Sequence, residues 1–476
     1  MTRSILPLAG IVLVLAGGRL VSATESGFMA DVAPILVRRC AGCHGPIKAE
    51  GDYRLHTYQY LRLAGASGSA AIVPGKPDES ELFKRLVDDD TTTRMPQEDE
   101  ALSAREVALV RRWITAGAQF DGADPRGSFK SQLPPRLHPD PPGVYRLAIP
   151  VQALAFQPDG RELAVAGRNE VTVWNPVSGV LIRRLQRLPE RIMAMAYSRD
   201  GKHLLVGGGS PGDYGELLLV DPLGQRPHRL LATCEDSVLA LALSHDSQTV
   251  VATAADRSVR TFRLADGKPL WRSQLHADFV TACGFSADDR WVATGGRDFT
   301  IKVLEAATGA LYTTYNGHKL QFGEENGRHQ VFCLAFAGDG ARLFSAGEGK
   351  AIRAWEPAKA RAENGSASDM EERFSKAGHT RYLYHNAPHG VYHLAVVGQQ
   401  LFAACGDGLA RQYDLGTLKL VRELKGHTGR VIAVDGHLGT GLVATGSFDG
   451  EVRLWEIATG KLVRAFQGGR ITDQGR

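Results

Sequence analysis

The strongest constraint on the fold of this 476-residue chain is a phrase that recurs from residue 151 onward. The segment 151–160, Val-Gln-Ala-Leu-Ala-Phe-Gln-Pro-Asp-Gly, returns in similar form at residues 192–201, 238–246, 280–288 and 331–340. Each copy has the alternating side-chain pattern of a β-strand and ends in polar residues typical of a tight turn. The repetition therefore predicts an array of similar β-sheets.

The spacing of the repeats indicates four-stranded units. After each phrase the sequence predicts a second strand and then a third, which ends in an aromatic or aliphatic residue: Trp174, Val220, Phe262, Leu304, Trp355, Tyr413 and Trp455. Phe262 and Leu304 are 42 residues apart, as are Tyr413 and Trp455. A period of about 40–45 residues is typical of the blades of a β-propeller. The 54 glycines fit a chain rich in tight turns.

These repeats resemble the WD-repeat family. The last repeat is nearly complete, with Gly426-His427, Thr445-Gly446-Ser447, Asp449 and Leu454-Trp455, whereas Gly317-His318 and Gly378-His379 are partial signatures. The second repeat lacks both the Gly-His pair and the tryptophan. The resemblance implies an all-β ring of about seven four-stranded blades over residues 144–470. It also implies that His427, Asp449 and Trp455 form a network that ties strands together, so we assign no catalytic residue there.

A second motif lies near the start of the chain, where Cys40-Ala41-Gly42-Cys43-His44 has the form C-x-x-C-H. This is the attachment motif of c-type haem: two thiols one helical turn apart bind the haem vinyl groups, and the histidine coordinates the iron. A redox-active C-x-x-C pair and half of a zinc site are the alternatives. A zinc site needs a second ligand pair, which this cysteine-poor region does not offer. The motif therefore predicts one covalent haem c on Cys40, Cys43 and His44.

A low-spin haem needs a second axial ligand opposite His44, and the sequence favours Met95. This residue lies on a loop before the last helical pattern of the region. A thioether is a soft, neutral ligand that favours ferrous iron and raises the reduction potential. The other methionine between residues 24 and 122 is Met29, on the helix before the motif. The rival ligand is His56, and a methionine can also serve only as packing.

Helical patterns flank the motif. Residues 31–39 place apolar side chains on one face. A capping box at Ser103-Ala-Arg-Glu106 opens a last helix that ends at Gly117. On that helix we expect Trp113 to pack against the haem or the first helix, or simply in the core.

The same region resembles the planctomycete-type cytochrome c domain. The resemblance rests on six segments: Cys40–Gly45, Gly51–Leu55, Ile72–Pro77, Ser80–Leu82, Met95–Pro96 and Trp113–Ala118. The resemblance runs through most of residues 28–120. It implies an all-α domain with His44 and Met95 as the axial ligands of the haem iron, and it implies redox chemistry without indicating a substrate.

The start of the chain predicts export. Arg3 precedes an apolar run from Ile5 to Ala16, and Val21-Ser22-Ala23 has the small-x-small form of a signal-peptidase site. Residues 1–23 are therefore predicted to be a signal peptide, with an uncleaved membrane anchor as the alternative. In either case the protein is expected in the periplasm or otherwise exported, where haem c attachment takes place.

The predicted organisation follows from these motifs. Residues 24–122 form the cytochrome domain, residues 123–143 a proline-rich extended linker, and residues 144–470 the propeller. Four further cysteines, Cys234, Cys283, Cys333 and Cys405, lie in apolar segments without a disulfide-like spacing, so we expect buried thiols.

Two segments between propeller strands are candidates for a binding surface. Residues 317–330 carry His318, Arg328 and His329, and residues 378–390 carry His379, Arg381, Tyr382, Tyr384, His385 and His389. Both are expected to be loops on one face of the ring, where they would hold a partner, a metal or an added cofactor. The alternative is that they are variable surface loops without a function.

The formal net charge of +4 over 476 residues gives no indication of nucleic-acid binding. The sequence therefore predicts a c-type cytochrome that transfers electrons to or from redox partner proteins, with a propeller that docks a further protein. The alternative is a periplasmic redox enzyme whose propeller carries an additional cofactor or substrate site. A membrane contact is expected only if the N-terminal segment is not cleaved.

Overall fold

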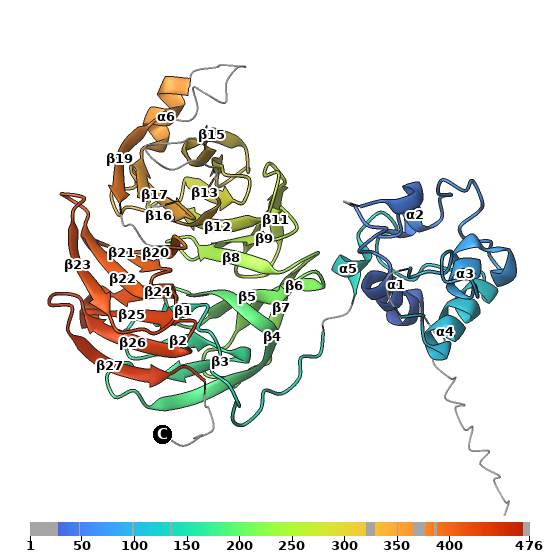
Figure 1. The fold of residues 1–476 in the computed structure, drawn as a ribbon, viewed down its shortest axis with the longest axis horizontal. Helices are drawn as coiled ribbons and strands as arrows, with labels where there is room; N and C mark the ends of the chain where they lie inside the picture. The colour runs from blue at the N-terminus through green and yellow to red at the C-terminus, as the bar shows by residue number, and fades with distance from the viewer. Residues whose placement is uncertain are drawn as a thin grey trace, which may run out of the picture. The chain divides into compact units, whose positions relative to one another are not determined.

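The computed structural model describes residues 27–46, 48–97, 100–133, 136–319, 329–349, 351–364, 377–384 and 388–469. The predicted signal peptide lies outside these residues. The chain divides into two compact units, residues 1–133 and 134–476 (Figure 1). Within the described residues, no helix is both long enough and apolar enough to cross a bilayer.

The first unit is small and helical. A π-helical turn at Phe28–Val32 leads into α1 (Ala33–Arg39), which is followed by α2 (Tyr58–Leu61), α3 (Glu81–Leu86), α4 (Ala104–Thr115) and α5 (Phe129–Gln132), with 3-10 turns at Glu50–Asp52 and Pro77–Glu79. The capping box of α4 is confirmed. The Ser103 hydroxyl accepts from the Glu106 backbone N–H at 3.3 Å, and the Glu106 carboxylate accepts from the Ser103 N–H at 2.9 Å.

Phe28 is the centre of the core of this unit, with 1% of its surface exposed. Its ring lies 4.9 Å from that of Trp113 on α4 and 5.0 Å from that of Phe129 on α5, measured between centroids. Trp113 therefore packs against the turn that leads into the first helix, which is one of the positions expected for it. Its indole N–H donates to the carbonyl of Gln119 at 2.8 Å.

The second unit is a β-propeller of six antiparallel sheets (Figure 1). The first sheet has seven strands: β1 (Leu154–Phe156), β2 (Leu163–Ala166), β3 (Arg168–Trp174), β4 (Leu181–Tyr197), β5 (Leu204–Ser210), β6 (Tyr214–Val220) and β7 (Arg229–Cys234). Each of the others has four. The second contains β8 (Val238–Leu243), β9 (Thr249–Ala254), β10 (Val259–Arg263) and β11 (Pro269–Ser273), and the third β12 (Val280–Phe285), β13 (Trp291–Gly296), β14 (Ile301–Glu305) and β15 (Leu311–Tyr315).

The remaining three sheets follow in chain order. The fourth contains β16 (Val331–Phe336), β17 (Leu343–Gly347), β18 (Ala351–Trp355) and β19 (His379–Tyr384), with α6 (Pro357–Asn364) inserted before β19. The fifth contains β20 (Val391–Val397), β21 (Gln400–Cys405), β22 (Leu409–Asp414) and β23 (Leu420–Lys425). The last contains β24 (Val431–His437), β25 (Leu442–Ser447), β26 (Glu451–Glu456) and β27 (Leu462–Gln467).

The repeated phrase has a clear structural meaning. Val238, Val280 and Val331 begin β8, β12 and β16, whereas Val151 precedes β1 and Ile192 lies within β4. All five of these first residues are at most 1% exposed. Val391 and Val431, whose copies of the phrase are too divergent to be recognised by sequence, are buried in the same way. Six of the seven predicted third-strand ends lie on the third strand of their sheet, including Trp174 on β3 and Trp455 on β26, whereas Val220 lies on β6, the sixth strand of the first sheet.

The long strand β4 explains why the first sheet has seven strands. Residues 181–186 of β4 pair with β3, whereas residues 191–197 pair with β5. The second half of β4 also packs against β8 of the next sheet, as a first strand does elsewhere in the ring. Two repeats thus share one continuous strand.

The ring closes where the first and last sheets meet. The Val151 N–H donates to the carbonyl of Ser447 at 3.0 Å, and the Phe156 N–H donates to the Asp435 carboxylate at 2.7 Å. The two sheets also share one apolar core. Every sheet is built from strands contiguous in sequence, so side-to-side packing closes the ring, and within the described residues no strand from one end of the chain joins the sheet of the other end.

Asp435 is expected to make the stability of this seam depend on pH. Burial raises its pKa from 3.8 to about 6, against the opposing effect of the Phe156 and Gly436 N–H groups. The folded state therefore binds the Asp435 proton more tightly than the unfolded state does. The stability that this proton contributes is complete below pH 4 and is lost as the pH rises through 6. Between pH 4.5 and 7.5, the free energy of unfolding of Asp435→Asn, relative to that of the wild type, should increase by up to about 3 kcal/mol.

Urea unfolding followed by tryptophan fluorescence measures this difference, since five of the six tryptophans lie in the second unit. Asp159→Asn, which changes an exposed aspartate in the neighbouring β1–β2 turn, is the matched control and should keep the wild-type pH dependence. Identical pH dependence in the wild type and in Asp435→Asn would contradict the assignment.

The segment predicted to be an extended linker, residues 123–143, is divided between the two units. Its first part carries Phe129, which is fully buried in the core of the first unit, and the division falls between Leu133 and Pro134. From Arg136 onward the chain lies on the propeller. The proline content carries no information about the partners of the charged residues between the prolines.

We call residues 136–145 the strap. Arg136 forms a two-pronged ion pair with Asp213 at 2.8 and 3.0 Å, and its guanidinium lies 4.2 Å from the centre of the Tyr214 ring. The next contact is buried: His138 Nε2 lies 2.7 Å from the Glu216 carboxylate, with the two side chains 8% and 3% exposed. These contacts make the strap a structural part of the propeller.

Two buried glutamates explain where the strap binds. Glu170 and Glu216 each stand four residues before the third-strand end of their repeat, on β3 and β6. Glu170 accepts from the Tyr145 hydroxyl at 2.8 Å, and it also pairs with Arg184. The strap thus supplies Tyr145 and His138 to the first two repeats, which lack a Gly-His pair of their own.

Candidate functional site

Cys40, Cys43 and His44 lie together in one turn at the end of α1. The Cys40 N–H continues the helix by donating to the Leu36 carbonyl at 3.0 Å. The Cys40 carbonyl then accepts from the N–H groups of Cys43 and His44, at 3.2 and 3.0 Å. The two thiols differ: Cys40 packs against the core and burial raises its pKa to about 12, whereas Cys43 is exposed.

The imidazole of His44 is oriented by the backbone. His44 Nδ1 lies 3.3 Å from the carbonyl oxygen of Tyr53, so it must carry the proton in order to donate to it. Its Nε2 makes no hydrogen bond to any described residue. Histidines that ligate a metal through one nitrogen typically donate the other N–H to a carbonyl in this way. Two thiols and an oriented imidazole on one turn therefore fit the donor set of a haem c.

Met95 lies on the loop between α3 and α4. Its backbone N–H donates to the carbonyl of Arg85, the last residue but one of α3, at 2.8 Å. Its side chain is half-buried. The structure thus places the Met95 loop beside the end of α3, and Met95 stays a predicted ligand of the haem iron. The Arg39 side chain donates to the Glu100 carbonyl and so ties the end of α1 to the segment that follows Met95.

The alternatives to Met95 differ from one another. Met29 is buried in the core, and its N–H donates to the Asp121 carboxylate at 2.8 Å. His56 stacks on Tyr60 with ring centroids 5.1 Å apart, and burial lowers the pKa of its imidazole. His56 Nδ1 is buried without a hydrogen-bond partner among the described residues. His56 thus stays the chemical rival of Met95, whereas Met29 is a packing residue.

The predicted network in the last propeller repeat is confirmed. Thr445 Oγ1 lies 2.8 Å from His427 Nε2 and accepts from the indole N–H of Trp455 at 2.9 Å. His427 Nδ1 lies 3.4 Å from the Asp449 carboxylate. With Glu451 these groups are close enough to ligate a metal ion, but Arg453 already pairs with Glu451 at 2.6 Å. The arrangement is that of a structural network.

The same network occurs in the third sheet, where the sequence analysis missed it. His276 Nδ1 lies 3.0 Å from the Asp298 carboxylate, and its Nε2 lies 2.9 Å from Thr294 Oγ1. The hydrogen bond from His276 is among the interactions that lower the pKa of Asp298 to about 2, against the effect of burial. A signal was present: His276 precedes Thr294 by 18 residues and Asp298 by 22, as His427 precedes Thr445 and Asp449.

The prediction of two paired binding loops is wrong in most of its residues. His318 is 1% exposed, and its Nε2 lies 2.9 Å from the Ser345 hydroxyl, so it belongs to the structural network of the fourth sheet. Residues 379–384 are strand β19, paired with β18. Residues 320–328 and 385–387, which include Arg328 and His385, lie outside the described residues. The half-buried His379 lies 3.2 Å from the Tyr315 hydroxyl through Nδ1.

Comparison with known proteins agrees with the division of the chain into a small helical unit and a propeller. A family model described as planctomycete cytochrome C matches residues 40–99, and the WD domain, G-beta repeat, matches residues 225–263, 267–304, 309–356 and 418–456. The human angio-associated migratory cell protein is 28% identical over 242 residues, which cover 50% of this chain and 49% of that protein. An uncharacterized WD repeat-containing protein of Synechocystis is 30% identical over 136 residues, 28% of this chain and 38% of the relative.

The chain spans about half the length of the first curated relatives it matches. The WD matches begin at residue 225, after the two repeats to which the strap binds.

Proposed function

We propose that this chain, which is similar to planctomycete cytochrome C over residues 40–99 and to the WD domain within residues 225–456, is an exported electron carrier with one covalent haem c, whose propeller docks a partner protein. The observation that carries the proposal is the turn after α1, where two thiols accompany an imidazole whose Nδ1 is directed to a backbone carbonyl. The proposed export rests on the predicted signal peptide, residues 1–23, and places the protein in the periplasm or outside the cell.

Four residues would hold the haem. Cys40 and Cys43 would form its thioethers, and His44 and Met95 would be its axial ligands. The haem would supply a one-electron couple, with the methionine raising its potential. The protein's contribution is to hold the His44 ring through the Tyr53 carbonyl and to hold the Met95 loop through Arg85.

We propose further that the propeller has seven blades. The two halves of β4 would be the fourth strand of one blade and the first strand of the next, which divides the seven-stranded sheet into two units that share β4. This interpretation agrees with the seven third-strand ends at Trp174, Val220, Phe262, Leu304, Trp355, Tyr413 and Trp455. A rigid ring of this kind is suited to present loops to a partner.

The absorption spectrum of the purified, reduced protein tests this proposal against the enzyme alternative. We expect the bands of a single c-type haem, in a stoichiometry of one per chain by iron analysis. An additional chromophore or a second metal would support a redox enzyme whose propeller holds its own cofactor, and the proposal of a pure electron carrier would then be wrong.

A further inference from the structure

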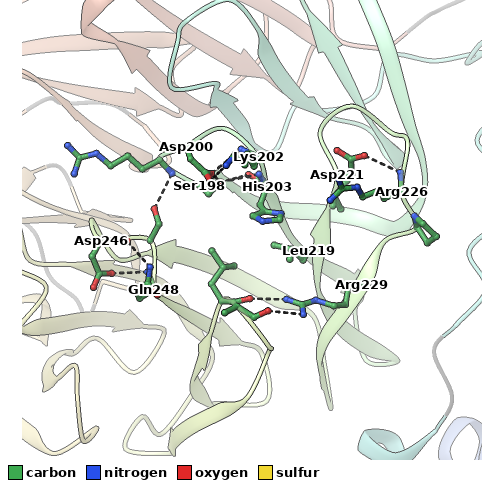
Figure 2. Close-up of a pocket in the computed structure, with 16 residues that line it drawn as sticks. Ser198, Asp200, Lys202, His203, Leu219, Asp221, Arg226, Arg229, Asp246 and Gln248 are labelled. Atoms are coloured by element: carbon green, nitrogen blue, oxygen red, sulfur yellow. Dashed lines mark hydrogen bonds and ion pairs between the residues drawn. The ribbon is translucent and has the colours of Figure 1, made fainter.

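An open cleft of about 750 Å³ lies on the second unit, where the first two sheets meet (Figure 2). Its walls are the β4–β5 turn, the β6–β7 turn and the β8–β9 turn, together with residues 264–265 between β10 and β11. Its floor includes the apolar side chains of Leu219, Val220 and Leu264, which are at most 9% exposed. The cleft thus combines an apolar floor with polar walls.

The three acidic residues of the cleft are occupied by their own turns. Asp200 accepts from the Ser198 hydroxyl at 2.6 Å, and Asp246 accepts from the Gln248 N–H at 2.8 Å. Asp221 accepts from three backbone N–H groups of the β6–β7 turn, which lower its pKa against the effect of burial. These carboxylates shape the turns and have little capacity left for the cations beside them.

The basic residues of the cleft fall into two groups. Arg229 already donates to the carbonyls of Leu264 and Ala265, at 2.8 and 3.0 Å, whereas the others are poorly paired. The side chains of Arg199, His203 and Arg226 make no hydrogen bond to the part of the chain that the structure describes, and Lys202 Nζ lies 3.7 Å from Asp200. Figure 2 shows His203 between the turn that carries Lys202 and the apolar Leu219, with Arg226 on the neighbouring turn. The walls therefore offer several cations to a ligand.

The β6–β7 turn is longer than most of the corresponding turns of the ring, although the β18–β19 connection, which contains α6, is longer still. Eight residues, 221–228, separate β6 from β7, whereas five residues separate third from fourth strands at 264–268, 306–310, 415–419 and 457–461. The longer turn carries Arg226 and forms one wall. The other turns that line the cleft lie on the same face of the ring, because strand direction alternates within each antiparallel sheet.

We infer that this cleft binds an acidic peptide segment of a partner protein, with its carboxylates on Lys202 and Arg226 and an apolar side chain on the floor at Leu219. The inference rests on the proposed docking role of the propeller and assigns it a place and a chemistry. A cleft of this volume is much larger than a single inorganic anion and lies in the range of sites for larger ligands. Cations on separate turns suit a ligand whose anionic groups are also separated.

The test measures binding of a fluorescein-labelled peptide, Glu-Asp-Leu-Glu-Asp, to the full-length protein by fluorescence anisotropy in about 0.15 M salt, where the Debye length is about 8 Å. We expect Lys202→Glu/Arg226→Glu to weaken binding by about tenfold or more, since two charge-assisted contacts become repulsive. Lys419→Glu/Lys461→Glu is the matched control: it changes the net charge equally, at exposed lysines on two of the five-residue turns. The control should bind the peptide within about twofold of the wild type, because exposed charges beyond a Debye length are largely screened.

Failure to bind the peptide, or an equal loss of binding in the control variant, would overturn the inference. Complete displacement of the peptide by an equal concentration of inorganic phosphate would also overturn it, since the site would then be one for small anions. The haem spectrum of the same samples keeps this test separate from the proposed function. If the protein binds the peptide but contains no haem, the cleft assignment is supported and the proposed cytochrome is rejected. If it contains haem but does not bind the peptide, the cleft assignment is rejected and the proposed cytochrome is supported.

Discussion

Cys40→Ala/Cys43→Ala is expected to give a protein that loses all its haem when it is denatured. The two thiols are on one turn after α1, and thioether bonds to them are the covalent link that survives unfolding. Without them, His44 and any opposite ligand hold the iron by coordination alone, and coordination is lost with the fold. Denaturing gel electrophoresis stained for haem peroxidase activity, together with intact mass, measures the effect.

The matched control removes two other thiols. Cys234→Ala/Cys283→Ala changes two cysteines of the propeller whose thiol pKa values are raised to about 12 by burial, so they are expected to be inert. This control should keep one covalent haem per chain. Covalent haem retained by the Cys40/Cys43 double variant would end the proposal that these thiols attach it.

Met95→Leu is expected to open one axial position of the iron almost completely. Leucine preserves the volume of the side chain but lacks the thioether, so the ferrous protein should change from low-spin to high-spin and bind carbon monoxide, which the wild type should exclude. The reduction potential should fall because the ligand that favours ferrous iron is lost. Visible spectra with and without carbon monoxide measure the spin state and the binding of carbon monoxide at once.

Met29→Leu is the matched control for this change, because Met29 is buried in the core of the same unit with its backbone tied to Asp121. It should leave spin state and potential unchanged. If Met95→Leu also leaves them unchanged, Met95 is not a ligand. His56→Ala is then the next variant to examine, because the buried Nδ1 of His56 has no hydrogen-bond partner among the described residues.

Much of the propeller could be predicted because its information is local and periodic. An alternating strand that begins with a buried aliphatic residue has to recur in every sheet, so Val238, Val280 and Val331 mark their strands without any knowledge of the fold. The capping box at Ser103 and the turn of Cys40 to His44 are local in the same sense. Each of these features depends on residues only a few positions apart.

The strap could not be predicted because its partners are distant and not periodic. Arg136 pairs with Asp213 and His138 with Glu216, over separations of 77 and 78 residues. Nothing near Arg136 or His138 in the sequence indicates that its partner is a distant carboxylate of the propeller. Composition therefore indicated a linker where the structure has a segment bound to the propeller by ion pairs.

The error at residues 379–384 had a different cause. A Gly-His pair at 378–379 was interpreted as the start of a loop, although His379-Thr-Arg-Tyr-Leu-Tyr384 is rich in residues that favour strands. The insertion of α6 between β18 and β19 displaces this strand from the position that the 40–45-residue period predicts. A high density of histidines does not by itself indicate a binding loop, because burial beside Ser345 gives His318 a structural role.

A spectroelectrochemical titration of the full-length protein tests the central claim most directly. The account predicts one reversible wave that fits a single one-electron couple, with the absorbance of one c-type haem following the potential throughout. A protein that shows no reversible wave, or two couples of equal size, would contradict the assignment of a single redox-active haem on Cys40, Cys43 and His44.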